Sequence, residues 1–210
     1  MTVRHALDIL EVEGLIDRRR GRSGGTYVRT VAPTLSLTSK EGIIAQLREQ
    51  GHDTVVQVVS VNKEPVAKGA AAVLAVDDST LTWEIKRLYF VDDAPVALSR
   101  YTIPAAMVPD LDQRDLHESI MEVLAGYNLK PAFTRENLSA ATARMEEQKL
   151  LQVSRSHPLL RFVRLLKDET GRAIAYIEAS LRSDIVNVEV IMGDEPAPEP
   201  STSRGAGENT

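Results

Sequence analysis

The segment 83–104 constrains the fold more than any other part of this chain. Two runs rich in β-branched and aromatic residues flank an Asp-rich break at 91–94, and this pattern is typical of an antiparallel β-hairpin. Because alternate side chains of a strand point to the same face, Arg87 shares a face with the apolar residues of its own strand. The residues expected on that face are Trp83, Ile85, Arg87 and Tyr89 on the first strand and Ala97, Ser99, Tyr101 and Ile103 on the second.

Arg87 admits two interpretations. An arginine among apolar residues on a strand face is a candidate contact for a bound ligand. The same arginine can instead extend its aliphatic part past the core and leave its charge in solvent. Which residue faces Arg87 across the hairpin depends on the length of the turn.

A two-residue turn, Asp92-Asp93, would place Arg87 opposite Leu98. A three-residue loop, 92–94, places Arg87 opposite Ser99, because a one-residue slip moves every side chain to the other face. The tight turn needs positive φ at both central residues, and Asp-Asp serves it less well than Asp-Gly. The sequence therefore favours the three-residue loop. In this register a pocket is lined by Arg87, Tyr89 and Ser99, and Arg100 points to the opposite face.

Composition excludes several classes of protein. The chain has 210 residues, enough for one large or two small domains, and a net charge of −5, so bulk charge does not draw it to nucleic acid. It has no cysteine, which excludes disulfides, thiolate metal sites and cysteine catalysis and suggests a cytoplasmic protein. No apolar run approaches membrane-spanning length, and the N-terminus has no signal-peptide pattern.

Residues 1–30 carry a pattern of their own. Apolar residues recur at helical spacing across 2–13, and Gly14 is a good stop after them. An extended piece, a basic glycine-rich tip at 17–25 and a second extended piece follow, which predicts a short hairpin. The arginines of the tip can contact phosphates, and its glycines let a backbone approach a groove. A solvated charged loop is the alternative interpretation of the same run.

The stretch TVRHALDILEVEGLIDRRRGRSGGTYV resembles the recognition helix and wing of the GntR-family winged helix-turn-helix, with both motifs in the family's order. The resemblance implies DNA contacts by Thr2, Arg4 and His5 in the helix and by Arg20, Gly21, Arg22 and Thr26 around the wing. The wing has extra Ser-Gly residues, and two helices that precede the recognition helix in the family are absent.

Without those two helices, each large apolar side chain of the recognition helix left exposed forgoes roughly 1.5–3 kcal/mol. We therefore expect residues 1–30 to form a partial winged helix-turn-helix that binds DNA weakly by itself. A truncated start assignment, a proteolytic product and a deliberate fragment all remain open as reasons.

The rest of the chain predicts an α+β domain, an antiparallel sheet with flanking helices. Residues 31–38 are expected to be a linker, 39–192 the domain itself, and 193–210, almost without apolar residues, a disordered tail. Beside the hairpin, the predicted strands are 55–62, 132–141, 159–166, 173–181 and 187–192. The predicted helices are one that starts after a capping-box spacing at 38–41 and closes at Gly51, and then 67–76, 116–126 (which contains Ser119) and 142–151.

Short motifs across this domain resemble the UTRA effector-binding domain of the HutC subfamily, whose fold is similar to that of chorismate lyase. The motifs keep the family's order and approximate spacing from 39 to 192. The matching residues are Arg87-Leu88-Tyr89, the DDAP run at 92–95, Ile103-Pro104, Ser119, Gly171, the YIE run at 176–178 and the RSD run at 182–184.

The resemblance also implies a ligand pocket, with Arg87, Ser119, Glu178 and Arg182 at matching positions. Tyr89 stands where the family has a second arginine, and Ser99 where it has a glutamate. Clustered positive donors favour phosphosugars, so the loss of one arginine points towards a less charged ligand. Tyr89 either contacts that ligand or belongs to the core, and Glu178 either enters the pocket or faces solvent. The candidate effector-binding residues are Arg87, Tyr89, Ser99, Ser119 and Glu178. Arg182 and Asp184 are interpreted as a structural pair or a domain contact rather than as ligand groups.

These patterns predict a ligand-responsive DNA-binding transcriptional regulator, a repressor released by a small-molecule effector. A two-fold pair of half-sites on DNA implies a homodimer. One alternative is a ligand-binding and dimerisation module without DNA binding. A chorismate lyase-like enzyme is less favoured, because the four histidines have neither metal spacing nor a nucleophile partner. No metal, cofactor or catalytic site is predicted, and the histidines concerned are His5, His52, His117 and His157.

Overall fold

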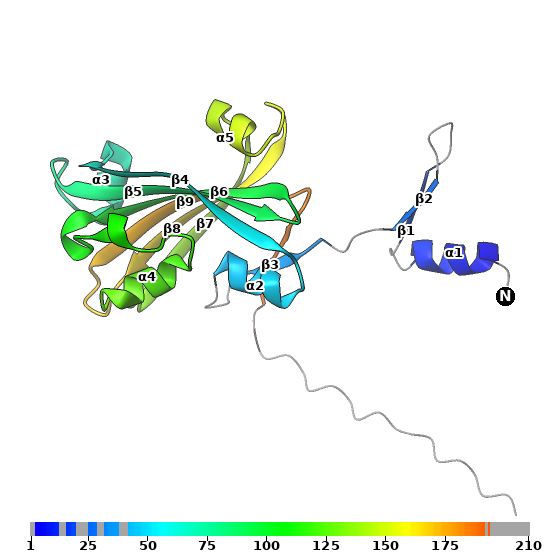
Figure 1. Cartoon of the computed structure of the whole chain (residues 1–210), viewed down its shortest axis with the longest axis horizontal. Helices are drawn as coiled ribbons and strands as arrows, with labels where there is room; N and C mark the ends of the chain where they lie inside the picture. Colours follow the sequence, from blue (N-terminus) through cyan, green and yellow to red (C-terminus); the bar gives the residue numbers. More distant parts are fainter. Residues whose placement is uncertain are drawn as a thin grey trace, which may run out of the picture.

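The computed structural model describes residues 3–12, 16–19, 25–28, 32–37, 42–191 and 193 of the chain. Its main body is a six-stranded antiparallel sheet with short helices on both faces (Figure 1). The predicted α+β class is therefore confirmed. In spatial order the strands are β4 (Thr54–Pro65), β5 (Leu81–Val91), β6 (Ala94–Pro104), β9 (Ala173–Arg182), β8 (Pro158–Lys167) and β7 (Phe133–Thr142).

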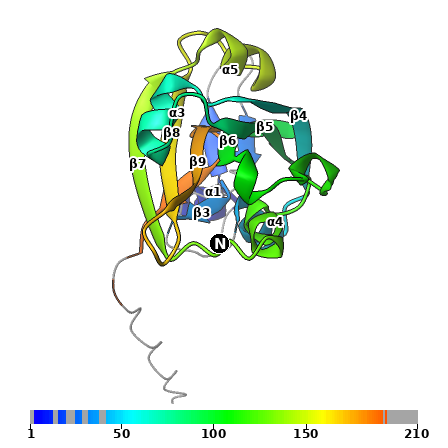
Figure 2. The same cartoon turned by 90° about the vertical axis from the view of Figure 1, so that its left-hand side faces the viewer.

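Helices cover the two faces of this sheet separately (Figures 1 and 2). On one face lie α2 (Ile43–Glu49) and α4 (Ile120–Gly126), and on the other lie α3 (Lys68–Leu74) and α5 (Met145–Leu150). Two 3-10 turns, η1 (Ala105–Met107) and η2 (Leu111–Gln113), follow β6. Because the central strands β5 and β6 are covered on both faces, Leu81 is the one residue of these two strands that is exposed. Within the described residues, no helix is both long and apolar enough to cross a membrane.

The hairpin between β5 and β6 differs from the prediction at its turn. Asp92 and Asp93 have φ values of 48° and 66°, and Val91 pairs with Ala94, so the turn has two residues rather than three. Asp tolerates this left-handed backbone region better than most residues. The Asp92 carboxylate also accepts the backbone N–H of Asp53 at 3.1 Å, which holds the turn against the neighbouring strand.

A β-bulge nevertheless restores the predicted pairing. Tyr89 pairs with Ala97 and Phe90 with Pro95, so Val96 is the extra residue on β6. Beyond the bulge, Arg87 lies opposite Ser99, as the sequence predicted. The predicted partner is correct, but the three-residue loop invoked to explain it is wrong.

The segment 31–38, predicted to be a linker, contains a strand. β3 (Thr34–Ser36) pairs in parallel with β10 (Asn187–Glu189), and the buried Leu35 side chain packs in the core with residues of β5 and β8. The linker prediction is wrong for this segment because Leu35 and Pro33 are both buried. β10 also ends three residues short of the predicted 187–192.

The N-terminal part contains α1 (Val3–Val12) followed by an antiparallel pair, β1 (Ile16–Arg19) and β2 (Gly25–Val28). This is the predicted order of a helix and a short hairpin. Arg18 of β1 pairs with Asp8 and Glu11 of α1. None of the residues of α1 is buried. Of the predicted tip at 17–25, residues 17–19 belong to β1 and Gly25 to β2, and 20–24 lie outside the described residues. The predicted disordered tail, apart from Gly193, also lies outside them.

Candidate functional site

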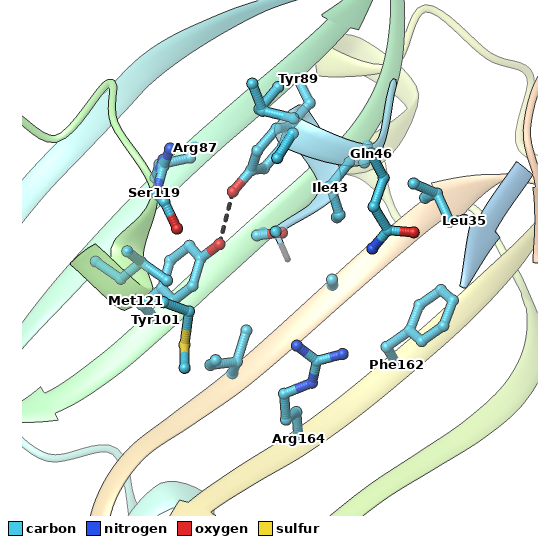
Figure 3. Close-up of a pocket in the computed structure, with 18 of the residues that line it drawn as sticks. Leu35, Ile43, Gln46, Arg87, Tyr89, Tyr101, Ser119, Met121, Phe162 and Arg164 are labelled. Carbon is cyan, nitrogen blue, oxygen red and sulfur yellow. Dashed lines mark hydrogen bonds between the residues drawn. The ribbon is translucent and has the colours of Figure 1, made fainter. Parts of the chain in front are cut away.

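A cavity of about 210 Å³ lies between the sheet and the elements α2, α4 and β3 (Figure 3). The hairpin strands form one wall, α2 and β3 a second, and β8 and β9 a third. The lining includes Arg87, Tyr89, Ser99 and Tyr101 from the hairpin, Ser119 and Met121 at the start of α4, Leu35 and Gln46 from the β3 and α2 wall, and Phe162 and Arg164 from β8.

Arg87 is the most unusual group in this cavity. The residue is 1% exposed because its strand, β5, lies inside the sheet between β4 and β6. Its Nη2 donates to the carbonyl oxygen of Glu118 at 2.7 Å and more weakly to that of His117 at 3.4 Å. Its Nε and Nη1 have no hydrogen-bond partner. None of the ion pairs among the described residues involves Arg87, so a buried charge is left with two free donors.

Two tyrosines lie beside this guanidinium. Its carbon is 5.3 Å from the ring centre of Tyr89 and 5.7 Å from that of Tyr101, within cation–π range. The two tyrosine hydroxyls share a hydrogen bond of 2.6 Å (Figure 3). Burial, followed by the proximity of Tyr101, raises the pKa of Tyr89 well above its usual value, although the charge of Arg87 acts in the opposite direction. Tyr89 is therefore neutral at physiological pH, and its hydroxyl can donate a hydrogen bond to a ligand.

The two serines of the predicted site also line the cavity. Ser99 is buried directly opposite Arg87. Ser119 is the N-cap residue of α4, which begins at Ile120, so the prediction that it lies within a helix from 116 is wrong. Its backbone carbonyl accepts the first hydrogen bonds of the helix, from Glu122 and Val123. The cavity therefore brings together Arg87, Tyr89, Ser99 and Ser119, four of the five predicted effector-binding residues.

Glu178, the fifth predicted residue, lies elsewhere. It pairs with Arg100 across β9 and β6, whereas Ala179 pairs with Ser99 on the cavity side. The prediction that Glu178 shares a pocket with Arg87 is therefore wrong, because its strand presents it to the opposite face of the sheet. Arg100 lies on that opposite face, as predicted.

Glu178 borders a second cavity of about 270 Å³, on the α5 side of the sheet. Glu147 is the centre of this region: its carboxylate accepts two hydrogen bonds from Arg161, at 2.9 and 3.0 Å, and one from the Ser180 hydroxyl at 2.6 Å. Burial alone raises the pKa of Glu147, but the hydrogen bonds from Ser180, the Arg144 backbone and Arg161 outweigh it and hold the pKa below its usual value. Charged residues that line this second cavity are thus paired with one another.

Sequence reasoning missed two groups that line the first cavity. Arg164 of β8 makes a bidentate pair with Glu136 of β7, with both hydrogen bonds at 3.0 Å. The wall formed by Leu35 and Gln46 was also missed, because it comes from a segment interpreted as a linker and from the helix after it. The position of Arg164 on a strand was visible in the sequence, but no local signal tied it to Arg87.

The predicted DNA-binding residues lie in the N-terminal part of the chain. Arg4 and His5 are exposed on α1, and Thr26 is exposed on β2. The remaining four, Thr2, Arg20, Gly21 and Arg22, lie outside the described residues. The predicted structural pair of Arg182 and Asp184 is present, with hydrogen bonds of 3.2 and 2.8 Å.

Comparison with known proteins agrees with the fold. Residues 49–187 match the UTRA domain. The chain is 30% identical over 189 residues to the HTH-type transcriptional regulator GgaR of Escherichia coli (strain K12), covering 88% of this chain and 73% of that protein. It is 25% identical to the HTH-type transcriptional repressor NagR of Bacillus subtilis (strain 168), over 88% of this chain and 75% of that protein.

Among solved structures, PhnF from Mycobacterium smegmatis superposes with a TM-score of 0.79 at 23% identity, covering 92% of this chain and 84% of that one. Its separate effector domain superposes with a TM-score of 0.71 at 20% identity, over 77% of this chain and 99% of that one. The domain match covers more than half of the chain. The chain therefore belongs to the UTRA-domain family of GntR-type transcriptional regulators.

Proposed function

We propose that this regulator is a repressor whose binding to DNA is released by a small anionic effector held at Arg87. The observation that carries the proposal is the buried guanidinium whose Nε and Nη1 have no partner. A buried donor without a partner costs about 1–3 kcal/mol, and more when it is charged. Nε and Nη1 lie on different edges of the guanidinium, and a carboxylate or phosphate in the cavity could accept a charged hydrogen bond from either donor.

The rest of the cavity favours a ligand with one anionic group and an apolar body. Its charged lining side chains are three arginines, Arg48, Arg87 and Arg164, and three glutamates, Glu118, Glu122 and Glu136. Because Glu136 already neutralises Arg164, this balance disfavours a polyanion. Apolar residues such as Phe162 and Leu35 line the side away from the hairpin, and a mixed lining of this kind suits a small amphipathic molecule.

DNA binding is proposed for the N-terminal helix and hairpin. The proposed contacts are Thr2, Arg4, His5, Arg20, Gly21, Arg22 and Thr26, and the exposure of Arg4, His5 and Thr26 is compatible with that role. Relatives named as transcriptional regulators and repressors support the proposal. We further propose a homodimer, because a two-fold protein matches paired half-sites, and a cytoplasmic location, where bacterial DNA is found.

A catalytic role for the cavity is the weaker proposal. His117 Nδ1 lies 3.0 Å from Asp115, and Ser119 lines the same cavity. The pKa of Asp115 is lowered mainly by the backbone N–H and ring of His117. An activated hydroxyl needs its base within hydrogen-bond reach, and among the described residues no hydrogen bond joins His117 to Ser119. Turnover of chorismate or another small aromatic acid by the purified protein would reverse this preference.

The test of the effector class is calorimetric titration of the full chain with four probes: benzoate, phenyl phosphate, inorganic phosphate and benzyl alcohol. We expect benzoate, which combines one charge with an apolar ring, to bind more tightly than inorganic phosphate or benzyl alcohol. Arg87→Met should abolish benzoate binding, and Arg100→Met, on the opposite face, should leave it unchanged. Equal binding of benzyl alcohol and benzoate, or undiminished benzoate binding by Arg87→Met, would refute the assignment of Arg87.

Release of DNA needs a second experiment. The protein used to select operator sequences from random DNA should be the complete product of the gene, including any residues that the gene encodes before residue 1. We expect a palindromic sequence that is released by the best-binding probe, and no release in Arg87→Met. Selection of a palindrome that the bound probe does not release would contradict the proposed repressor mechanism.

A further inference from the structure

The short strand β3 is bonded along both of its edges, and only one of its neighbours is a strand. On the first edge it pairs with β10, where Leu37 N donates to Glu189 O at 3.0 Å. On the second edge, glutamine side chains occupy the place of a neighbouring strand. Gln46 Oε1 accepts Ser36 N at 2.7 Å, and Gln46 Nε2 donates to Ser36 O at 3.2 Å.

Gln50 repeats the same arrangement one helical turn later. Its Oε1 accepts Thr34 N at 2.8 Å, and its Nε2 donates to Thr34 O at 2.7 Å. Four residues along a helix advance about 6.0 Å, and two residues along a strand advance about 6.6 Å. Because these repeats nearly match, two amides at i and i+4 can bond alternate residues of one strand. We name the pair Gln46 and Gln50 the glutamine clamp.

The glutamine clamp adjoins the candidate effector cavity. Gln46 lines that cavity, and so does Leu35, which lies between the two clamped positions (Figure 3). The clamped residue Ser36 lines it too. β2 ends at Val28 and β3 begins at Thr34, so five residues, 29 to 33, separate the hairpin of the DNA-binding part from the clamped strand. A change at the cavity wall is therefore close in sequence to the part proposed to contact DNA.

We propose that the glutamine clamp couples occupancy of the cavity to the DNA-binding part of the chain. A ligand seated at Arg87 with its apolar body against Leu35 contacts Gln46 from inside the cavity. The Gln46 amide cannot keep both bonds to Ser36 and also turn towards the ligand, so binding weakens the hold on β3. Gln46 and Gln50 are thus positioning residues. The inference rests on the proposed function, because it assumes that a ligand enters this cavity.

The clamp itself is tested by hydrogen exchange of individual backbone amides in the full chain. In Gln46→Met, the Ser36 amide should exchange about tenfold faster, as expected for the loss of one to two net hydrogen bonds, and in Gln50→Met the Thr34 amide should do so. The Leu37 amide, bonded to β10, should keep its protection. Gln57→Met, at an exposed glutamine of β4, is the matched control and should change none of these rates. Unchanged exchange at Ser36 and Thr34 in the clamp variants would overturn the proposal.

The coupling is tested by the distance between a spin label in the DNA-binding part and one on the sheet. This distance would not change if the clamp had only a local structural role. The chain has no cysteine, so spin labels can be placed at Thr26→Cys on β2 and Glu64→Cys on β4 alone. We expect saturating benzoate and the Gln46→Met substitution to shift the distribution of distances between the labels in the same direction. In Gln46→Met, benzoate should cause little further shift. Faster exchange at Ser36 with an unchanged label distance in Gln46→Met would reduce the clamp to a structural contact and refute the coupling.

A cavity-filling variant separates failure of this inference from failure of the proposed effector class. Ala179 of β9 lines the cavity but takes no part in the clamp, and Ala179→Phe places a ring where a ligand body would lie. If benzoate does not bind while Ala179→Phe still shifts the label distance, the anion assignment fails and the coupling holds. If neither benzoate nor Ala179→Phe shifts it, the coupling is refuted.

Discussion

The substitution Arg87→Met tests whether Arg87 binds the ligand or only stabilises the fold. Methionine keeps a long, flexible apolar stem in the buried strand and removes only the charge and the donors. An arginine held in a buried ion pair is costly to remove, because the partner charge is left alone, and such breaks cost about 3–5 kcal/mol. Arg87 has no such partner among the described residues.

The expected change in stability follows from its contacts. Removing the two donors without partners, Nε and Nη1, returns about 2–6 kcal/mol. Losing the charged hydrogen bond to Glu118 O costs about 1.5–3 kcal/mol, and losing the two cation–π contacts costs about 1–4 kcal/mol together. These sums nearly cancel, so the free energy of unfolding without ligand should change by no more than about 1–2 kcal/mol.

The assay is thermal unfolding of the full chain with and without benzoate. In a protein of this size 1 kcal/mol corresponds to about 2–4 °C, so Arg87→Met should unfold within roughly 8 °C of the parent. Ligand at a hundred times its Kd adds about 2.7 kcal/mol to the parent, and this gain should vanish in Arg87→Met. Arg161→Met is the matched control, because it strands the buried Glu147 carboxylate and should cost about 3–5 kcal/mol. If Arg87→Met is as damaging as Arg161→Met, Arg87 has a structural partner and the reasoning fails.

Three further predictions concern stability. Glu147→Gln should lower the free energy of unfolding by about 1.5–3 kcal/mol in urea titrations, because it removes the charged hydrogen bonds that half-buried Arg161 makes to the carboxylate. The pKa of Glu147 is lower in the folded protein than in the unfolded chain, where it is near 4.3. The ionised carboxylate therefore stabilises the fold above about pH 4.3, and this stabilisation is lost as the pH falls through the folded pKa. Below about pH 4.3, acid should therefore lower the free energy of unfolding more steeply in the parent than in Glu147→Gln. Asp93→Gly should stabilise the hairpin slightly, because relief of the left-handed backbone at φ 66°, about 1–2 kcal/mol, exceeds the chain entropy of about 0.4–1 kcal/mol that glycine adds to the unfolded state. Asp92→Gly should gain less, because it loses the carboxylate bond to Asp53. Differential scanning calorimetry of the two variants checks this.

The sequence by itself determined the local structure around the candidate site. Alternation of side chains put Arg87 on one face with Trp83 and Ile85 of its own strand, and an Asp-rich break marked the turn of the hairpin. Motif order across the domain gave the family and the α+β class. These features depend on residues close together in the chain, or on patterns repeated along it, and such patterns persist whatever the distant parts of the chain do.

Only the tertiary structure decided which distant residues meet. The bulge at Val96 compensates for the two-residue turn, and no local pattern required it. Glu178 faces away from the cavity because its register against β6 is set by packing, and a slip of one residue would reverse its face. β3 is a strand because β10, about 150 residues later, pairs with it and two glutamines bond its other edge. Pairings across such separations depend on burial over the whole fold, which a short window of sequence does not contain.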